Sequence, residues 1–242
     1  MFRLTNKILR FSKTKSVRIL MYHSVLPEKE IKYKNNLTVS RENLEKQLFY
    51  IRNNYNTLFF KDLESNKSLE NKLILTFDDG YYNNVQHLVP LLEKYGLKAT
   101  IFIPTQLILN DTSRTFMTFK EIKNLNPDLI EIALHSHSHR NYAQISLQEA
   151  EEDIIENIKT LEKYEIRFTK ILAYPYGKFP IHKKNEFFNM LEKAGITAAL
   201  RIGNNIDTYP WKNKFEIQRI DIKGSDNLSV FKWKLRLGKI RP

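Results

Sequence analysis

Two adjacent carboxylates, Asp78 and Asp79, are among the residues of this sequence best suited to chemistry. They follow an apolar run at residues 73–77, which has the length and composition of a buried strand, and Gly80 comes directly after them. Acids at the carboxyl end of a buried strand are typical of the mouth of a parallel sheet or barrel, where catalytic loops collect. Adjacent strand residues point to opposite faces, but a glycine allows a sharp turn that could bring both carboxylates into one site. The simpler interpretation is an ordinary Asp-Gly turn.

Three alternating histidines follow a second apolar run, at residues 129–134. His135, His137 and His139 are three of the six histidines in the chain. Neutral imidazole and carboxylate form a standard ligand set for Zn²⁺ or a similar divalent ion, and three protein ligands leave a position open for water. The sequence therefore predicts a metal site made of one of the two acids and two of the three histidines. A solvated polar loop is the alternative, and the spacing does not say which histidine is left out.

The histidine segment must bend if its outer members are to share one ion. In an extended chain His135 and His139 would lie roughly 13 Å apart, at about 3.3 Å per residue. Ligand nitrogens lie only about 2.0–2.1 Å from a bound Zn²⁺. A helical turn would bring the two histidines together as an i, i+4 pair.

Strands and helices alternate along the chain in a way that would position these residues. Buried strands are expected at residues 17–22, 73–77, 99–103, 129–134, 171–174, 197–200 and 215–222. Helices are expected between them, with Ser40 capping the first, Gly96 ending the second, capping boxes at Thr118 and Ser146, and a final helix over residues 228–237. This order predicts a parallel α/β architecture in a single domain, in which the acids, the histidines and the Pro-Tyr-Gly of residues 175–177 face one mouth.

The charge of the chain narrows its range of partners. The 242 residues include 39 basic and 27 acidic side chains, a net charge of +12, which favours an anionic partner such as a glycan, a nucleic acid or a membrane surface. No nucleic-acid-binding motif accompanies the charge, so no nucleic-acid partner is expected. The chain contains no cysteine, which excludes disulfides and thiolate metal sites.

The two ends of the chain carry much of the positive charge. The first 18 residues lack the continuous apolar core of a signal peptide, and no apolar run is long enough to span a bilayer. A cytoplasmic location is therefore expected, with a basic extension over residues 1–16 and a catalytic domain over residues 17–242. The closing segment places Phe231, Trp233 and Leu235 among basic residues, a pattern that could lie on an anionic membrane surface. An ordinary closing helix with a solvated basic face is the alternative.

Three motifs give the chain a resemblance to the polysaccharide deacetylases, carbohydrate esterase family 4. TFDDG at residues 76–80, the H-S-x-x-H pattern at residues 135–139 and PYG at residues 175–177 look like signature motifs of that family. The segments ILMYHSV, ATIFI and AYPYG resemble most closely the poly-N-acetylglucosamine deacetylase branch. The resemblance implies a single-domain distorted (β/α) barrel with about seven parallel strands. It also implies metal-dependent removal of the N-acetyl group from an amino sugar in a glycan or glycan precursor.

The same resemblance assigns roles at the matching positions. It makes Asp79, His135 and His139 the ligands of one divalent metal ion, with Zn²⁺ expected and Co²⁺, Ni²⁺ or Fe²⁺ as alternatives. It makes Asp78 the general base that takes a proton from metal-bound water as this water attacks the amide carbonyl. His137 falls on a variable position of the motif and is left out of the ligand set.

Outside the metal site, the resemblance holds at one motif and fails at two positions. Pro175 and Tyr176 match the motif that lines the acetyl pocket, where the Tyr176 backbone N–H would help to hold the oxyanion. Many members carry an arginine that braces the catalytic aspartate where this chain has Ala173, and Arg219 is the candidate replacement. The C-terminal Leu-x-His motif, which carries a general acid in many members, has no counterpart here. His23, at the end of the first expected strand, is the candidate to protonate the leaving amine or to bind substrate, and a structural histidine is the alternative.

Other activities would use the same residues. A deacylase of another N-acyl sugar, such as a formyl sugar on a lipid or nucleotide carrier, shares the machinery. The two departures also leave a metal-binding or sugar-binding pseudoenzyme as an alternative. The intact Asp78 argues against a pseudoenzyme, because a site that only binds metal has no use for a base.

Overall fold

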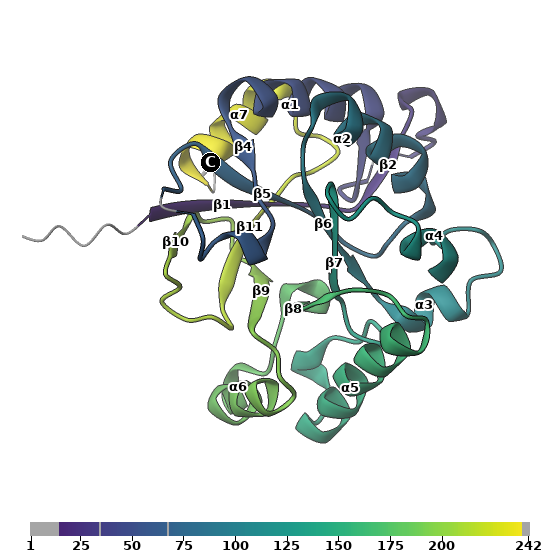
Figure 1. Cartoon of the computed structure of the whole chain (residues 1–242), viewed down its shortest axis with the longest axis vertical. Coiled ribbons are helices and arrows are strands. Elements are labelled where there is room, and N and C mark those ends of the chain that lie inside the picture. The colour runs from purple at the N-terminus through teal and green to yellow at the C-terminus, as the bar shows by residue number, and fades with distance from the viewer. Residues whose placement is uncertain (1–14, 34, 67, 239–242) are drawn as a thin grey trace, which may run out of the picture.

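Seven parallel strands close into a barrel in the computed structural model, which describes residues 15–33, 35–66 and 68–238. Around the barrel they are β1 (Lys15–Tyr22), β5 (Lys72–Phe77), β6 (Ala99–Ile103), β7 (Ile130–Leu134), β8 (Thr169–Ala173), β9 (Ala198–Ile202) and β11 (Ile217–Asp221). Strand β11 pairs with β1, which also pairs with β5, and this closes the ring (Figure 1). The predicted single-domain (β/α) barrel of about seven parallel strands is confirmed.

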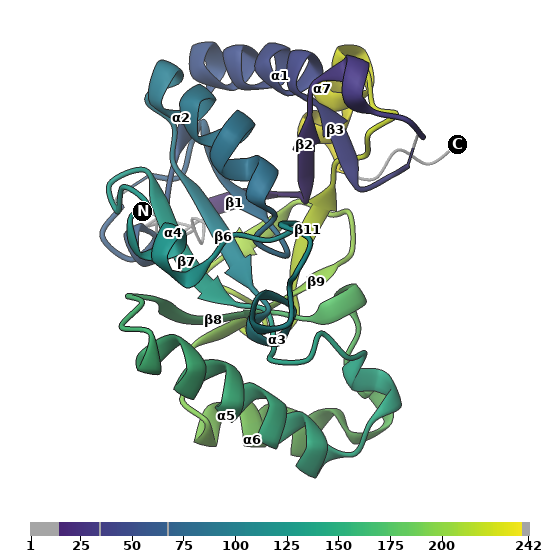
Figure 2. The same ribbon diagram turned by 90° about the vertical axis from the view of Figure 1, so that its right-hand side faces the viewer.

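Helices cover the outside of the barrel (Figures 1 and 2). The longer ones are α1 (Arg41–Asn54), α2 (Val89–Tyr95), α5 (Leu147–Lys163), α6 (Lys184–Lys193) and α7 (Leu228–Leu237), and the short ones are α3 (Thr105–Leu109) and α4 (Phe119–Lys123). Ser40 caps α1 and Gly96 ends α2 with φ 60°, as predicted. The predicted capping boxes at Thr118 and Ser146 open α4 and α5. Among the described residues no helix is long and apolar enough to cross a membrane.

Four short strands lie outside the barrel and were not predicted. They are β2 (Ser24–Leu26) and β3 (Thr38–Ser40), which pair with each other, β4 (Asn56–Thr57), which pairs with β5, and β10 (Asp207–Tyr209), which pairs with β1. Strands of two or three residues are too short to show the apolar alternation by which strands are recognised.

The ends of the chain differ from the prediction in two respects. Most of the expected extension over residues 1–16 lies outside the described residues, and β1 already begins at Lys15. In α7, Phe231 and Leu235 are buried in the protein core, so these two of the three interleaved apolar residues could not face a membrane. Trp233 is exposed, and the exposed residue one turn further along the helix is Leu237.

The lumen of the barrel holds apolar residues in its middle and polar ones toward both ends. Alternation along β7 directs Glu131, Ala133 and His135 to the same side, with His135 nearest the carboxyl end. At that end the lumen also holds Asp78 after β5 and Arg219 on β11. The carboxyl ends of the strands therefore gather the residues that the sequence singled out.

Candidate metal centre and active site

The turn after β5 brings both adjacent acids to the mouth of the barrel. Asp78 and Asp79 are 2% and 7% exposed. Asp79 itself has φ 70°, and this left-handed backbone turns the chain so that its carboxylate joins that of Asp78. Gly80 follows with φ 64°, and a Cβ there would lie only 2.8 Å from Ile103 Cδ1. The left-handed backbone favours a glycine at this position, and a larger residue would also have to displace the end of the Ile103 side chain.

Three side chains at this mouth could hold a metal ion. Asp79, His135 and His139 each offer one ligand atom, and these atoms lie within 4.8 Å of one another. The Asp79 Oδ1 atom is 3.4 Å from His135 Nε2 and 3.2 Å from His139 Nε2. The third histidine, His137, lies apart from this group, with its Nδ1 atom 2.8 Å from the Thr105 hydroxyl. The structure thus brings together the acid and the two histidines that the family resemblance indicated.

The chemistry of these atoms fits a bound cation. Asp79 Oδ1 is buried and has no hydrogen-bond partner among the described residues. His135 Nδ1 lies 2.8 Å from the Ala173 carbonyl oxygen, which can only accept, so Nδ1 carries the proton. In the neutral ring, Nε2 then presents its lone pair toward Asp79. One carboxylate oxygen and two imidazole nitrogens that converge in this way are a donor set that suits a divalent ion.

The segment between the two histidine ligands bends without forming a helical turn. Ser136 and His139 are both left-handed, with φ 71° and φ 57°. The His139 backbone N–H donates to the Ser136 hydroxyl oxygen at 2.8 Å. As a result the His135 and His139 rings lie 4.9 Å apart, centre to centre. The bend that the spacing required is present, but two non-glycine residues with positive φ produce it.

Asp78 is paired with a buried arginine. The two terminal nitrogens of Arg219 donate to Asp78 Oδ1 and Oδ2 at 2.6 and 2.7 Å. Arg219 is 0% exposed and also donates to the Thr76 hydroxyl at 3.2 Å. Burial alone would raise the pKa of Asp78, but the charge of Arg219 outweighs it and, with nearby His135, holds the pKa below its usual value. Asp78 is therefore a fixed, ionised carboxylate.

Two further predicted residues border the site. His23, which follows β1, places its Nε2 atom 3.8 Å from Asp78 Oδ2, with 14% of its side chain exposed. Tyr176 is 60% exposed and left-handed at φ 58°, and its ring centre lies 5.2 Å from that of His139. Pro175, just before it, is buried. His23 therefore lies beside Asp78, and the Pro-Tyr-Gly turn lies beside His139.

One residue of this region was missed from the sequence. Asp153, on α5, is 4% exposed and accepts hydrogen bonds from the backbone N–H groups of His137 and Ser138. The available signal was a charged residue beside Ala150 and Ile154, on the stripe of α5 that faces the core.

Comparison with known proteins agrees with this site. A sequence model described as polysaccharide deacetylase matches residues 65–199, more than half of the chain. That range contains Asp78, Asp79, His135, His139 and the Pro-Tyr-Gly turn. This chain belongs to the polysaccharide deacetylase family. His23 and Arg219 lie outside the matched range.

Curated relatives and solved structures extend the comparison to most of the chain. The protein YxkH of Bacillus subtilis (strain 168) is 28% identical over 197 residues, which are 79% of this chain and 66% of that protein. The poly-β-1,6-N-acetyl-D-glucosamine N-deacetylase of Staphylococcus aureus (strain N315) is 28% identical over 208 residues, 79% of this chain and 69% of that enzyme. This chain thus spans about two thirds of the length of both relatives.

Two solved structures share the fold. The Streptococcus pyogenes deacetylase PplD, in complex with acetate, superimposes with a TM-score of 0.78 at 19% identity and covers 94% of this chain and 100% of its own. IcaB from Ammonifex degensii does so with a TM-score of 0.72 at 18% identity, over 91% of this chain and 97% of its own. At these identities the likeness establishes the barrel and not the substrate.

Proposed function

We propose that this polysaccharide deacetylase family member is a metal-dependent N-deacetylase of an amino sugar in a glycan or glycan precursor. The observation that carries the proposal is the buried, unpartnered Asp79 Oδ1 between two imidazole nitrogens, beside the ionised Asp78. The Staphylococcus aureus relative, named as a poly-β-1,6-N-acetyl-D-glucosamine N-deacetylase, supports an N-acetylglucosamine polymer as the substrate.

Asp79, His135 and His139 would hold the metal ion, most simply Zn²⁺. A divalent ion in this place supplies Lewis acidity, which polarises the amide carbonyl and makes water more acidic. The chain itself fixes the ligands, because the Ala173 carbonyl oxygen orients the His135 ring at 2.8 Å. Co²⁺, Ni²⁺ and Fe²⁺ suit the same donor set.

Asp78 would act as the general base. Its two oxygens each accept one guanidinium N–H of Arg219, which leaves lone pairs free to accept a proton from the attacking water. The arginine also prevents Asp78 from swinging toward the metal ligands. Arg219 would thus replace the arginine that braces the catalytic aspartate in many family members, at the position where this chain has Ala173. A base kept in place in this way argues for an enzyme and against a metal-binding relic.

Tyr176 and His23 would handle the other charges of the reaction. The Tyr176 backbone N–H would donate to the oxyanion of the tetrahedral intermediate, and Pro175 would line the acetyl pocket. His23, close to Asp78 and partly exposed, would protonate the departing amine. We expect His23→Gln to lower kcat by about 10²-fold while zinc affinity is unchanged, which the pair of measurements would show. A normal rate would return His23 to a structural role.

The proposed function is tested by acetate release with matched histidine variants. The substrates are β-1,6-linked N-acetylglucosamine oligomers and their N-formyl analogues, with zinc-loaded and chelator-treated protein. Acetate release that stops with chelator and returns with Zn²⁺ is expected. His139→Ala should bind no zinc and be inactive, whereas His137→Ala, two residues away but outside the ligand set, should still bind zinc and be active at saturating Zn²⁺. Release of formate but no acetate would mean that the substrate carries an N-formyl group. Equal zinc binding and activity in the two histidine variants would overturn the proposed ligand set.

We further propose that α7 contacts an anionic membrane surface. Trp233 and Leu237, one turn apart, are 54% and 59% exposed, and the exposed Lys232 and Arg236 flank them. This combination of apolar and basic side chains on one helical face suits the headgroup region of a membrane. The location on the cytoplasmic side stays a prediction.

Vesicle binding tests the membrane contact. We expect the full chain to sediment with vesicles that contain phosphatidylglycerol and to remain in solution with vesicles of pure phosphatidylcholine. The double variant Trp233→Ser/Leu237→Ser should sediment less with the anionic vesicles. Sedimentation that does not change in this variant would overturn the proposed surface.

A further inference from the structure

One carboxylate from α5 holds the segment between the two histidine ligands. Asp153 accepts a hydrogen bond from Ser138 N at 2.8 Å, from His137 N at 3.1 Å and from the Tyr142 hydroxyl at 2.9 Å. The Ser138 hydroxyl also donates to it. Asp153 is 4% exposed and Tyr142 is 0% exposed, so these hydrogen bonds are shielded from water. Four donors therefore converge on a single buried carboxylate, and three of them come from the segment between the ligands.

This segment has a backbone that needs such support. Ser136 and His139 adopt left-handed conformations, which are unfavourable for residues other than glycine. Conformations of this kind persist only where the surrounding structure over-determines them. The hydrogen bonds of Asp153 fix His137 and Ser138, the two residues between the strained positions. The strain lies within the segment, and the restraint comes from the helix.

A second polar residue on the same helix face acts in the same direction. Asn157, one turn after Asp153, donates to the Ile103 carbonyl oxygen at 3.1 Å and to the Thr105 hydroxyl at 3.0 Å. Thr105 in turn meets the His137 ring at 2.8 Å. Helix α5 therefore holds the segment by its backbone through Asp153 and by the His137 side chain through Thr105.

We infer that Asp153 is a positioning residue for the metal centre. Its hydrogen bonds go to His137, Ser138 and Tyr142 and not to the proposed ligand atoms, and it acts by holding the backbone that joins His135 to His139 in the ligating shape. Without its carboxylate the segment relaxes, and binding of the metal must restore the strained shape at the expense of affinity. The inference rests on the proposed metal site, but it does not depend on which sugar or acyl group is the substrate.

Zinc affinity of the full chain tests this inference. Metal-free wild type, Asp153→Asn and Leu161→Ala are titrated with Zn²⁺ in a calorimeter. Asparagine keeps the size of the side chain, but its amide nitrogen cannot accept a hydrogen bond from His137 or Tyr142. We expect Asp153→Asn to raise the Kd for Zn²⁺ by about 10- to 100-fold, the usual effect of losing a partner that orients a metal ligand. Its kcat at saturating Zn²⁺ should stay within a few-fold of wild type.

Leu161→Ala is the control for loss of stability alone. Leu161 is 0% exposed on the same helix, and its truncation should lower Tm while the Kd for Zn²⁺ is unchanged. If Asp153→Asn does not fold, Ser138→Ala and Tyr142→Phe each remove one donor and should each raise the Kd several-fold. A Kd within twofold of wild type in Asp153→Asn, or in both replacement variants, overturns the inference.

The inference and the proposed function fail in different ways. Zinc binding that is weakened in Asp153→Asn supports the inference even if no acetate is released, and only the proposed activity is then wrong. Wild type that binds no zinc overturns the metal site and this inference together.

Discussion

The barrel buries a carboxylate near each of its ends, and the two have opposite surroundings. Asp78, at the carboxyl end of β5, receives both terminal nitrogens of Arg219. Glu131, near the amino end of β7, accepts from the Thr100 hydroxyl at 3.0 Å and from the Phe60 backbone N–H at 3.4 Å. Its other oxygen, Oε1, is buried without a hydrogen-bond partner among the described residues. Asp78 thus has a buried counter-ion, whereas no buried cation of the described residues pairs with Glu131.

The pKa values of the two acids follow from this difference. Burial raises the pKa of both groups, but at Asp78 the charge of Arg219 reverses the effect. At Glu131 burial dominates, and the pKa stays above its usual value although Thr100, Phe60 and Lys61 act to lower it. Burial therefore does not by itself mark a catalytic acid. In this protein the buried Arg219 decides which of the two buried acids has a lowered pKa.

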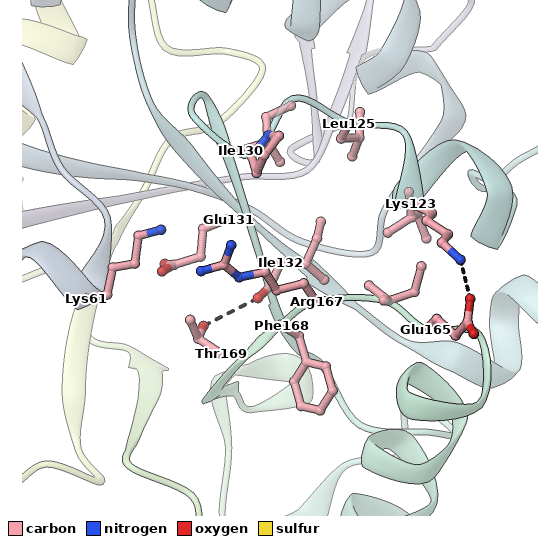
Figure 3. A pocket seen from close by; sticks show the side chains of 13 residues that line it. Lys61, Lys123, Leu125, Ile130, Glu131, Ile132, Glu165, Arg167, Phe168 and Thr169 are labelled. Carbon is pink, nitrogen blue, oxygen red and sulfur yellow. Dashed lines mark hydrogen bonds and ion pairs between the residues drawn. The ribbon is translucent and has the colours of Figure 1, made fainter.

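Glu131 lies beside an irregular part of the sheet and at the wall of a pocket. Strands β7 and β8 pair at Ala133 with Thr169 and at Leu134 with Leu172, so their register shifts between Ala133 and Leu134. A pocket of about 350 Å³ lies there, lined by Glu131, Lys61 and Arg167 among others (Figure 3). Both cations are exposed, and water therefore weakens their influence on the carboxylate.

The largest expected effect comes from removing the arginine. Arg219→Met leaves Asp78 buried without a counter-ion and should lower the free energy of unfolding by about 3–5 kcal/mol. The double variant Asp78→Asn/Arg219→Met should be more stable than Arg219→Met alone, because no unpaired charge then remains. Urea denaturation of the two proteins measures this. Equal stabilities would show that Arg219 does not act through Asp78.

A smaller effect of opposite sign is expected at the other carboxylate. Glu131→Gln removes a buried charge that has no counter-ion and keeps the size of the side chain. It should raise the free energy of unfolding at pH 8 by on the order of 1 kcal/mol. Asp78→Asn, the same change at the other end, should not stabilise the protein. Stabilisation by both substitutions would remove the contrast between the two ends.

The smallest expected effect is the pH dependence of the stabilisation by Glu131→Gln. Because the pKa of Glu131 is raised by folding, its stabilising contribution is complete below its ordinary pKa of 4.5 and is lost as the pH rises through the folded value. The advantage of Glu131→Gln over wild type should therefore grow as the pH rises above 4.5, with a slope of at most about 1.4 kcal/mol per pH unit, and become constant above the folded value. Denaturation midpoints across this range measure it. An advantage that is constant with pH would mean that Glu131 does not titrate differently in the two states.

The site could be predicted in large part because it lies where strands end. Asp78, Asp79 and the histidines follow predicted strands, and the carboxyl ends of parallel strands meet at one mouth. Arg219 was a candidate from its place in the last strand, and the structure places its guanidinium on Asp78. These residues could be grouped from topology and a family resemblance, without knowledge of loop shapes.

The remaining features depend on tertiary contacts that leave little trace in the sequence. The left-handed backbone at Ser136 could not be predicted, because no glycine marks it in the sequence. The hydrogen bonds of Asp153 that support this segment come from α5, a different element. Glu131 is an acid within an apolar strand, but the sequence does not show that the cations near it, Lys61 and Arg167, are exposed. A sequence shows that an acid is buried more readily than it shows what the acid touches.

The most direct test of the central claim is the Asp78→Asn variant, with acetate release and bound zinc measured on the same samples. The substrates are N-acetylglucosamine oligomers, and the wild type is the reference. We expect the variant to hold as much zinc as the wild type and to release acetate about 10²- to 10⁴-fold more slowly, because it lacks the base. A zinc-loaded variant that works at the wild-type rate would contradict the assignment of Asp78 as the base.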